Sequence, residues 1–183
     1  MKRFLAVFLL LCVVLAGVRG FGNFAEADQV PPEAFNPMTD PEPTIVTEGG
    51  VRYRLDLEND TALVLGAADF YGAEKIVIPA KITIYNHPFT VTAIDANAFA
   101  AMPNLKEVTI GKNVASVGKK AFYKCEKLKT LVIRTKLLTS KTIGSKAFGK
   151  TYEKIKVTVP KGKKAEYKEI LEKKGLSKKA KYQ

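Results

Sequence analysis

The amino-acid sequence predicts a mostly β solenoid, and three observations support this. An Ala-Phe pair recurs at residues 98–99, 121–122 and 147–148, with spacings of 23 and then 26 residues, and periods of roughly 20–50 residues are typical of solenoids. A short segment that alternates apolar and polar residues follows each pair, which is the pattern of a strand with one buried face. One such repeat cannot bury its own apolar face, so neighbouring repeats must stack.

The strand segments also fit a specific template. Leu105, Val108, Ile110 and Asn113 follow the leucine-rich pattern L-x-x-L-x-L-x-x-N. The second copy repeats the apolar positions and has Lys136 where the asparagine is expected. The third copy lacks a leucine before its strand. We therefore predict three repeats over residues 91–160.

The full unit from Val117 to Ile133 resembles the BspA-like leucine-rich repeats of bacterial surface proteins. Its residues follow the order Ile/Val-Gly-x-x-Ala-Phe-x-x-Cys-x-x-Leu-x-x-Leu-x-Ile. Met102 and Thr151 replace the cysteine in the other two copies. The resemblance extends over about Val51–Gly175. It implies a short, right-handed coil of the leucine-rich-repeat type, covered at its end by a helix, and roles in adhesion or attachment.

The repeats predict a continuous core. The small alanines let adjacent backbones approach closely, and the phenylalanines that follow them are expected to stack as an internal row. The leucines that precede each strand should lie in the same core. These predicted core residues are Phe99, Phe122, Phe148, Leu105 and Leu128.

Residues 1–27 are typical of an export signal. Lys2 and Arg3 precede an apolar run at Phe4–Gly17, and Ala25-Glu26-Ala27 offers a cleavage site before Asp28. An uncleaved anchor is the competing interpretation, and a lipoprotein is disfavoured because no small residue precedes Cys12. We expect an exported protein, secreted or held at the cell surface or envelope, whose mature chain has no membrane span.

Two segments separate this signal from the repeats. Residues 28–50 contain five prolines and predict a semi-extended tether. Residues 51–90 predict an N-terminal cap and a partial repeat: a hairpin over Val51–Gly66, a strand at Lys75–Pro79, and a second hairpin with its turn at residues 86–88. An open solenoid end needs such a cap, because it exposes backbone donors and core side chains.

Residues 161–183 predict a C-terminal helix cap and a basic tail. Ala165, Tyr167, Ile170 and Leu171 form an apolar stripe at helical spacing, and Gly175 is a stop signal. The remaining residues are polar and basic, and we expect them to fray.

The composition leaves few residues for catalysis. The chain has no Trp, one His and two Cys. His87 is expected at a turn tip as a solvated residue, with no partner for metal or catalytic work nearby in sequence. Cys125 is expected to be an inert core residue rather than a reactive thiol. We therefore predict no enzyme, no cofactor and no metal site.

Charge instead points to a binding surface. Residues 101–183 contain 23 Lys or Arg and 6 Asp or Glu. The outward positions of the predicted strands form a candidate concave face, on which the lysines 106, 129 and 156 would form one column. The alternative is that these lysines only provide solubility and prevent edge pairing. The candidate residues are Lys106, Glu107, Thr109, Lys129, Thr130, Lys156 and Thr158.

We expect a secreted or cell-surface binding module that mediates adhesion through a protein, an acidic glycan or a wall polymer. The alternative is a structural or interaction component of an envelope assembly with no host ligand. Specific nucleic-acid binding is disfavoured, because export separates the chain from the cell's nucleic acid and no recognition helix is evident.

Overall fold

The structure is a computed structural model that describes residues 45–183; the predicted signal peptide and most of the predicted tether lie outside these residues. The described residues form one compact unit. The elements are β1 (Ile45–Glu48), β2 (Val51–Asp56), β3 (Thr61–Ala67), β4 (Lys75–Ile78), β5 (Lys81–Ile84), β6 (His87–Ile94), β7 (Glu107–Ile110), β8 (Ser116–Val117), β9 (Thr130–Ile133), β10 (Lys156–Thr158), α2 (Lys164–Lys173) and β11 (Lys181–Tyr182).

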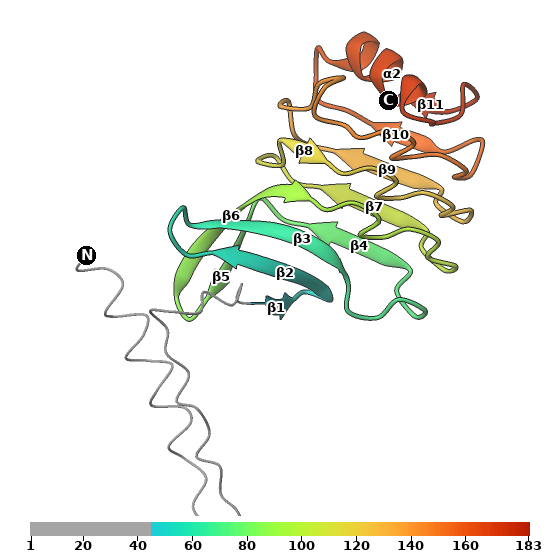
Figure 1. Ribbon diagram of the computed structural model, residues 1–183. Helices are drawn as coiled ribbons and strands as arrows, with labels where there is room; N and C mark the ends of the chain where they lie inside the picture. The colour runs from blue at the N-terminus through green and yellow to red at the C-terminus, as the bar shows by residue number, and fades with distance from the viewer. Residues whose placement is uncertain (1–44) are drawn as a thin grey trace, which may run out of the picture. The chain divides into compact units, whose positions relative to one another are not determined.

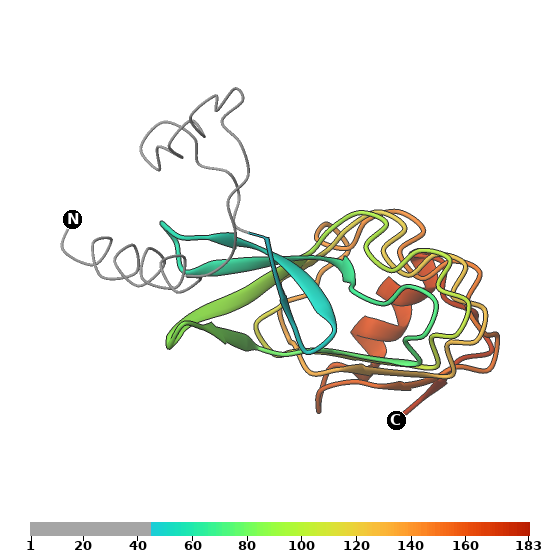
Figure 2. The same cartoon turned by 90° about the horizontal axis from the view of Figure 1, so that it is seen from below.

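Two stacks of parallel strands define the solenoid. The first is a five-stranded sheet in the order β11-β10-β9-β7-β4. The second stacks β3, β6 and β8, and continues through a bridge between Val117 and Ile143. The chain passes from one stack to the other and back, so the coils lie one upon another (Figure 1) and overlap when viewed from below (Figure 2).

This arrangement confirms the predicted fold class of a mostly β solenoid. The number of coils is larger than the three repeats that we predicted, because the first sheet has five rungs. Strand β4 supplies a rung before the first Ala-Phe pair, and β11 supplies one after the last.

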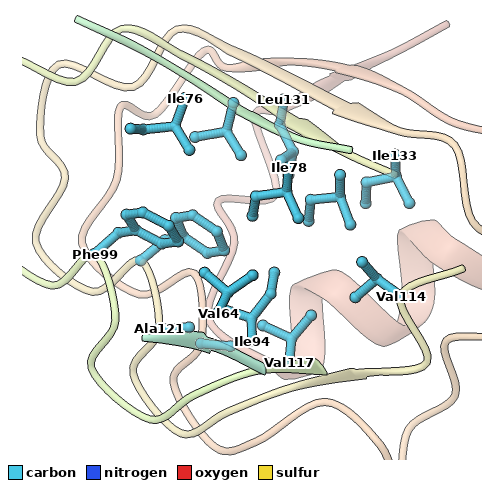
Figure 3. Close-up of a cluster of buried hydrophobic side chains, with 14 of the residues drawn as sticks. Val64, Ile76, Ile78, Ile94, Phe99, Val114, Val117, Ala121, Leu131 and Ile133 are labelled. Atoms are coloured by element: carbon cyan, nitrogen blue, oxygen red, sulfur yellow. The ribbon is translucent and has the colours of Figure 1, made fainter. Parts of the chain in front are cut away.

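The core lies between the two stacks. Ile76, Val108, Leu131 and Val157 occupy matching inward positions on four successive rungs and are 0–3% exposed. Figure 3 shows apolar side chains from both stacks meeting, with Phe99 at one end of the core and Val114 at the other.

The phenylalanines form the predicted internal row. Phe99, Phe122 and Phe148 are fully buried. Their ring centroids are 5.2 and 5.4 Å apart, and successive rings are within 9° of parallel. Leu105 and Leu128 are also fully buried beside them. The row is therefore a continuous aromatic seam through three coils.

Turn residues explain how the coils approach so closely. Gly118 lies against the backbone of the preceding coil, where an added Cβ would be 2.4 Å from the nitrogen of Ala96. Gly144 repeats this contact one coil later, at 2.4 Å from the nitrogen of Lys119. A side chain at either glycine would separate the coils.

Polar side chains on the opposite edge satisfy backbone groups of the neighbouring coil. The Asn113 side chain donates to the Ala80 carbonyl oxygen at 3.1 Å. In the next coil the Thr135 hydroxyl donates to the Val114 carbonyl oxygen at 2.7 Å and is fully buried. Thr135, and not Lys136, therefore replaces the asparagine of the template.

The N-terminal end differs from the sequence expectation at two points. β2 and β3 form an antiparallel hairpin over the predicted residues, but β1 adds a third strand within the segment that we assigned to the tether. β5 and β6 form the second hairpin, whose turn is at Tyr85 and Asn86. Both residues have positive φ, 50° and 61°, as the favoured two-residue hairpin turns require.

The C-terminal end is more ordered than predicted. Tyr167, Ile170 and Leu171 of α2 are buried against the last coil, and the Tyr167 hydroxyl donates to the Thr135 carbonyl oxygen at 2.9 Å. The expectation of a frayed tail is wrong, because β11 pairs with β10 and Leu176 is 3% exposed. Backbone pairing orders these residues although their side chains are mostly polar.

Candidate interaction surfaces

The outward side chains of the five-stranded sheet form the strand face, which carries most of the residues predicted to bind. Its register fixes two columns of neighbouring side chains. The first column contains Lys75, Glu107, Thr130, Lys156 and Lys181, and the second contains Val77, Thr109, Val132 and Thr158.

The predicted column of three lysines is not present. Lys156 pairs with Thr130, which in turn pairs with Glu107. Lys106 and Lys129 each lie one residue earlier, immediately before β7 and β9, and they are exposed at the border of the strand face. A shift of one position along a strand changes which side chains are neighbours on adjacent rungs. The strand face is therefore a mixed surface and not a lysine ladder.

Ion pairs neutralise the N-terminal part of this face. Lys106 binds Glu74 at 2.7 Å, and Lys75 lies 3.3 Å from Glu107. All four side chains are substantially exposed, so each pair contributes little to stability. The Lys129 ammonium lies 5.9 Å from the centroid of the Tyr152 ring. Charge available to an acidic ligand is thus concentrated toward the C-terminal coils.

A second surface was missed by the sequence reasoning. It lies on the turns that precede and contain the Ala-Phe pairs of two successive coils. We call it the lysine ridge, and it consists of Lys119, Lys120, Tyr123, Lys124, Lys146 and Lys150.

Backbone hydrogen bonds hold the two turns of the ridge in register. The Lys120 amide donates to the Ser145 carbonyl oxygen at 3.1 Å, and the Lys124 amide donates to the Gly149 carbonyl oxygen at 2.9 Å. Between them the Phe122 amide donates to the Ala147 carbonyl oxygen at 2.8 Å. The lysines therefore project from a fixed backbone.

Three ammonium groups surround one aromatic ring on the ridge. The Nζ atoms of Lys120, Lys150 and Lys124 lie 5.5, 5.8 and 6.0 Å from the Tyr123 ring centroid. The ring lies over Gly149, where an added Cβ would be 3.1 Å from it. Within residues 45–183, no ridge lysine forms an ion pair.

The signal that could have revealed the ridge is the repeat itself. The positions around each Ala-Phe pair include no lysine in the first coil, three lysines in the second and two in the third: Ala96, Asn97, Ala100 and Ala101, then Lys119, Lys120, Tyr123 and Lys124, then Ser145, Lys146, Gly149 and Lys150. Comparing these positions between copies shows where charge is concentrated, whereas counting charge along the chain does not.

The two residues considered for catalysis have structural surroundings. His87 is in strand β6 rather than at a turn tip, and its Nε2 lies 2.7 Å from an Asp60 carboxylate oxygen while its ring packs edge-on against Phe89. Cys125 is fully buried, and its thiol donates to the Phe99 carbonyl oxygen at 3.0 Å. Burial raises the pKa of this thiol to about 11, so at neutral pH it is protonated.

Metal sites, membrane-spanning helices and grooves are three further features that could indicate a function. Over residues 45–183, no three His, Cys, Asp or Glu side chains gather as a metal site would require. In the same part of the chain no helix has the length and apolarity to cross a bilayer. An open groove is lined by Glu48, Tyr53, Val77, Lys81 and Thr83 among others.

Comparison with known proteins agrees with the geometry. Residues 64–176 match the family model described as BspA type leucine rich repeat region, in six copies. No curated protein matches the chain.

Two solved bacterial structures share the fold. A leucine-rich repeat protein from Bacteroides capillosus is 21% identical, with a TM-score of 0.53, and the match covers 76% of this chain and 98% of that one. A leucine rich cell surface protein from Faecalibacterium prausnitzii is 24% identical, with a TM-score of 0.50, over 66% of this chain and 38% of that one. The chain thus spans well under half of the Faecalibacterium protein. The family match covers most of the chain, and the protein belongs to the BspA-type leucine-rich repeat family.

Proposed function

We propose that this protein is an exported, non-enzymatic interaction module displayed at the cell surface. One observation carries the proposal: the coils repeat their interior and vary their exterior. The buried positions hold the same residue types in successive coils, as at Phe99, Phe122 and Phe148. The outward positions change from alanine to lysine between adjacent coils. A scaffold of this kind presents a surface, and solenoids use such surfaces for binding.

The surroundings of the cysteine and the histidine, one protein of similar fold and the N-terminal apolar run also support the proposal. The described cysteine is buried and protonated, and the histidine is engaged with Asp60. A protein of similar fold, from Faecalibacterium prausnitzii, is named as a leucine rich cell surface protein. The apolar run at the N-terminus has the length and flanking charges of an export signal.

The partner that we propose is a protein or an acidic glycan, in an adhesion-type contact. The candidate contact residues on the strand face are those toward its C-terminal coils, where ion pairing with carboxylates is sparse: Lys129, Thr130, Lys156 and Thr158. Lys106, Glu107 and Thr109 lie on the same face, and the first two are engaged with Glu74 and Lys75.

Two experiments test this function. Fractionation of the tagged full-length protein should place it in the medium or the envelope; residence in the cytosol would contradict export. The protein recovered there is then applied to immobilised host matrix proteins and, separately, to envelope extracts. Saturable binding to matrix proteins supports adhesion, whereas binding to an envelope component alone supports the alternative role in an envelope assembly.

A strand-face variant, compared with a matched control variant, tests which surface binds. Replacing Lys129 and Lys156 with serine should weaken binding, while replacing Lys161 and Lys168, which are exposed on the C-terminal cap, removes the same charge and should not. Equal losses in the two variants would mean that net charge, and not the strand face, determines binding.

A further inference from the structure

We propose that the lysine ridge binds a linear glycan that carries sulfate or phosphate esters. This inference rests on the proposed function, because it names a partner for a surface-displayed module, and it places the contact on a surface other than the strand face. It follows from the geometry around Tyr123, from the charges that surround it, and from the order of the backbone below it.

The charge arrangement favours an anion. Three ammonium groups lie within 6.0 Å of one ring centroid, so they are close enough to repel one another. Lys119 and Lys146 add two more positive charges on the same two turns. Within residues 45–183 none of these lysines is paired with a carboxylate. A bound anion would relieve the repulsion, and a polyanion would do so along the whole ridge.

The aromatic ring favours a sugar polymer among the polyanions. Tyr123 is partly exposed and lies across Gly149, and the three ammonium groups lie over its ring at 5.5–6.0 Å from the centroid. A sugar ring presents C–H groups that pack on an aromatic ring, while its ester groups bind the ammonium groups above it. An acidic peptide would use the charges without needing the ring.

The backbone makes the site pre-organised. Lys120, Lys124, Lys146 and Lys150 all have left-handed φ values of 55–62°, and backbone hydrogen bonds between neighbouring coils fix the turns that hold them. The two turns are one coil apart, so their lysines repeat at the rung spacing of about 4.8 Å. Because the backbone below the lysines is already ordered, binding an extended chain costs little backbone conformational entropy.

The test compares two triple variants of the full-length protein. The ridge variant combines Lys120→Asn, Lys124→Asn and Lys150→Asn; asparagine tolerates positive φ, and Asn97 already occupies the position equivalent to Lys120. The control variant combines Lys112→Asn, Lys136→Asn and Lys141→Asn, which removes the same charge from the turns on the opposite edge of the coils. Thermal unfolding checks that both variants fold.

Binding is measured by biolayer interferometry on immobilised heparin, desulfated heparin, dextran phosphate and polyglutamate over a range of salt concentrations. The ridge variant should lose at least about tenfold in heparin affinity and about two units of salt-dependence slope, because each released counterion contributes nearly one unit. The control variant should lose less than about threefold. A third variant, with arginine at the same three ridge positions, should retain binding.

Several results would overturn the inference. These are equal losses in the ridge and control variants, an unchanged ridge variant, or polyglutamate binding as tightly as heparin, which would indicate an acidic protein as the partner. Preference for heparin over dextran phosphate identifies sulfate esters, and the reverse identifies phosphate esters. A protein found in the cytosol would refute the proposed function and leave these affinities unchanged, so the two failures can be distinguished.

Discussion

Truncating the central ring of the aromatic seam is the most informative single perturbation of the fold. Phe122 is fully buried between Phe99 and Phe148, at centroid distances of 5.2 and 5.4 Å. Phe→Ala changes in a core cost about 3–5 kcal/mol, and each stacked aromatic pair adds about 0.5–1.5 kcal/mol beyond area burial. Phe122→Ala removes two stacked pairs and Phe99→Ala removes one. We therefore expect the free energy of unfolding to fall by about 0.5–1.5 kcal/mol more for Phe122→Ala.

Urea unfolding of the purified protein measures this difference. The chain contains no Trp, so far-UV circular dichroism and tyrosine fluorescence are followed together, and coincident transitions establish two-state behaviour. Phe70, which is 40% exposed and outside the seam, provides the control, and Phe70→Ala should cost less than about 1 kcal/mol. The reasoning is refuted if Phe122→Ala costs no more than Phe70→Ala, or less than Phe99→Ala.

Four further outcomes follow from the structure. Gly118→Ala should destabilise the protein by at least about 2 kcal/mol in urea titrations, because its Cβ would be 2.4 Å from the Ala96 nitrogen; a neutral effect would contradict the close approach of the coils. Cys125, with its pKa raised to about 11 by burial, should react with a thiol reagent at pH 8 only as fast as the protein unfolds, and immediate labelling would exclude the buried position. Burial, assisted by the charge of Glu48, raises the pKa of Tyr53 from 10.0 to about 12. The folded state thus holds this proton more tightly than the unfolded state, so stability should be full below pH 10 and fall toward pH 12, less steeply in Tyr53→Phe; identical profiles would contradict this. Deleting residues 176–183 should lower the free energy of unfolding by about 1.5–3 kcal/mol, the value of burying the Leu176 side chain. An unchanged free energy of unfolding would instead indicate that these residues are frayed.

Much of the fold is determined by features that are visible in the sequence. The Ala-Phe period predicts the seam, and the apolar alternation predicts which strand residues face inward. Counting nine residues from each stacked phenylalanine reaches Val108, Leu131 and Val157, which share one column in the sheet. This count gives the correct register of Lys156, whereas alignment by lysine alone does not.

The ends of the solenoid were harder to predict, because backbone pairing determines them. β11 is two residues long and lies in a lysine-rich segment, and it is ordered by hydrogen bonds to β10. β1 pairs with β2 although its side chains are largely exposed. Side-chain patterning contains little information about strands of this kind. The same holds for Thr135, whose hydroxyl replaces an asparagine from a position one residue earlier than the template expects.

The binding surface could be predicted only in part. Total charge indicated a basic C-terminal half, but local contacts decide which lysines remain available. Glu74 is distant from Lys106 in sequence and pairs with it on the neighbouring rung. The ridge is formed by residues that are 26 positions apart along the chain, such as Lys124 and Lys150, and that adjoin one ring in space.

Nuclear Overhauser contacts between phenylalanine rings test the stacked coils most directly. Protein labelled only at phenylalanine is compared with single Phe→Leu variants at positions 99, 122 and 148, which assign each ring by the signal that disappears. The solenoid predicts contacts from the ring of Phe122 to both neighbours, at the 5.2 and 5.4 Å centroid separations. If the ring of Phe122 showed no contact with either Phe99 or Phe148, the successive coils would not share one core, and the display surface built on them would be contradicted.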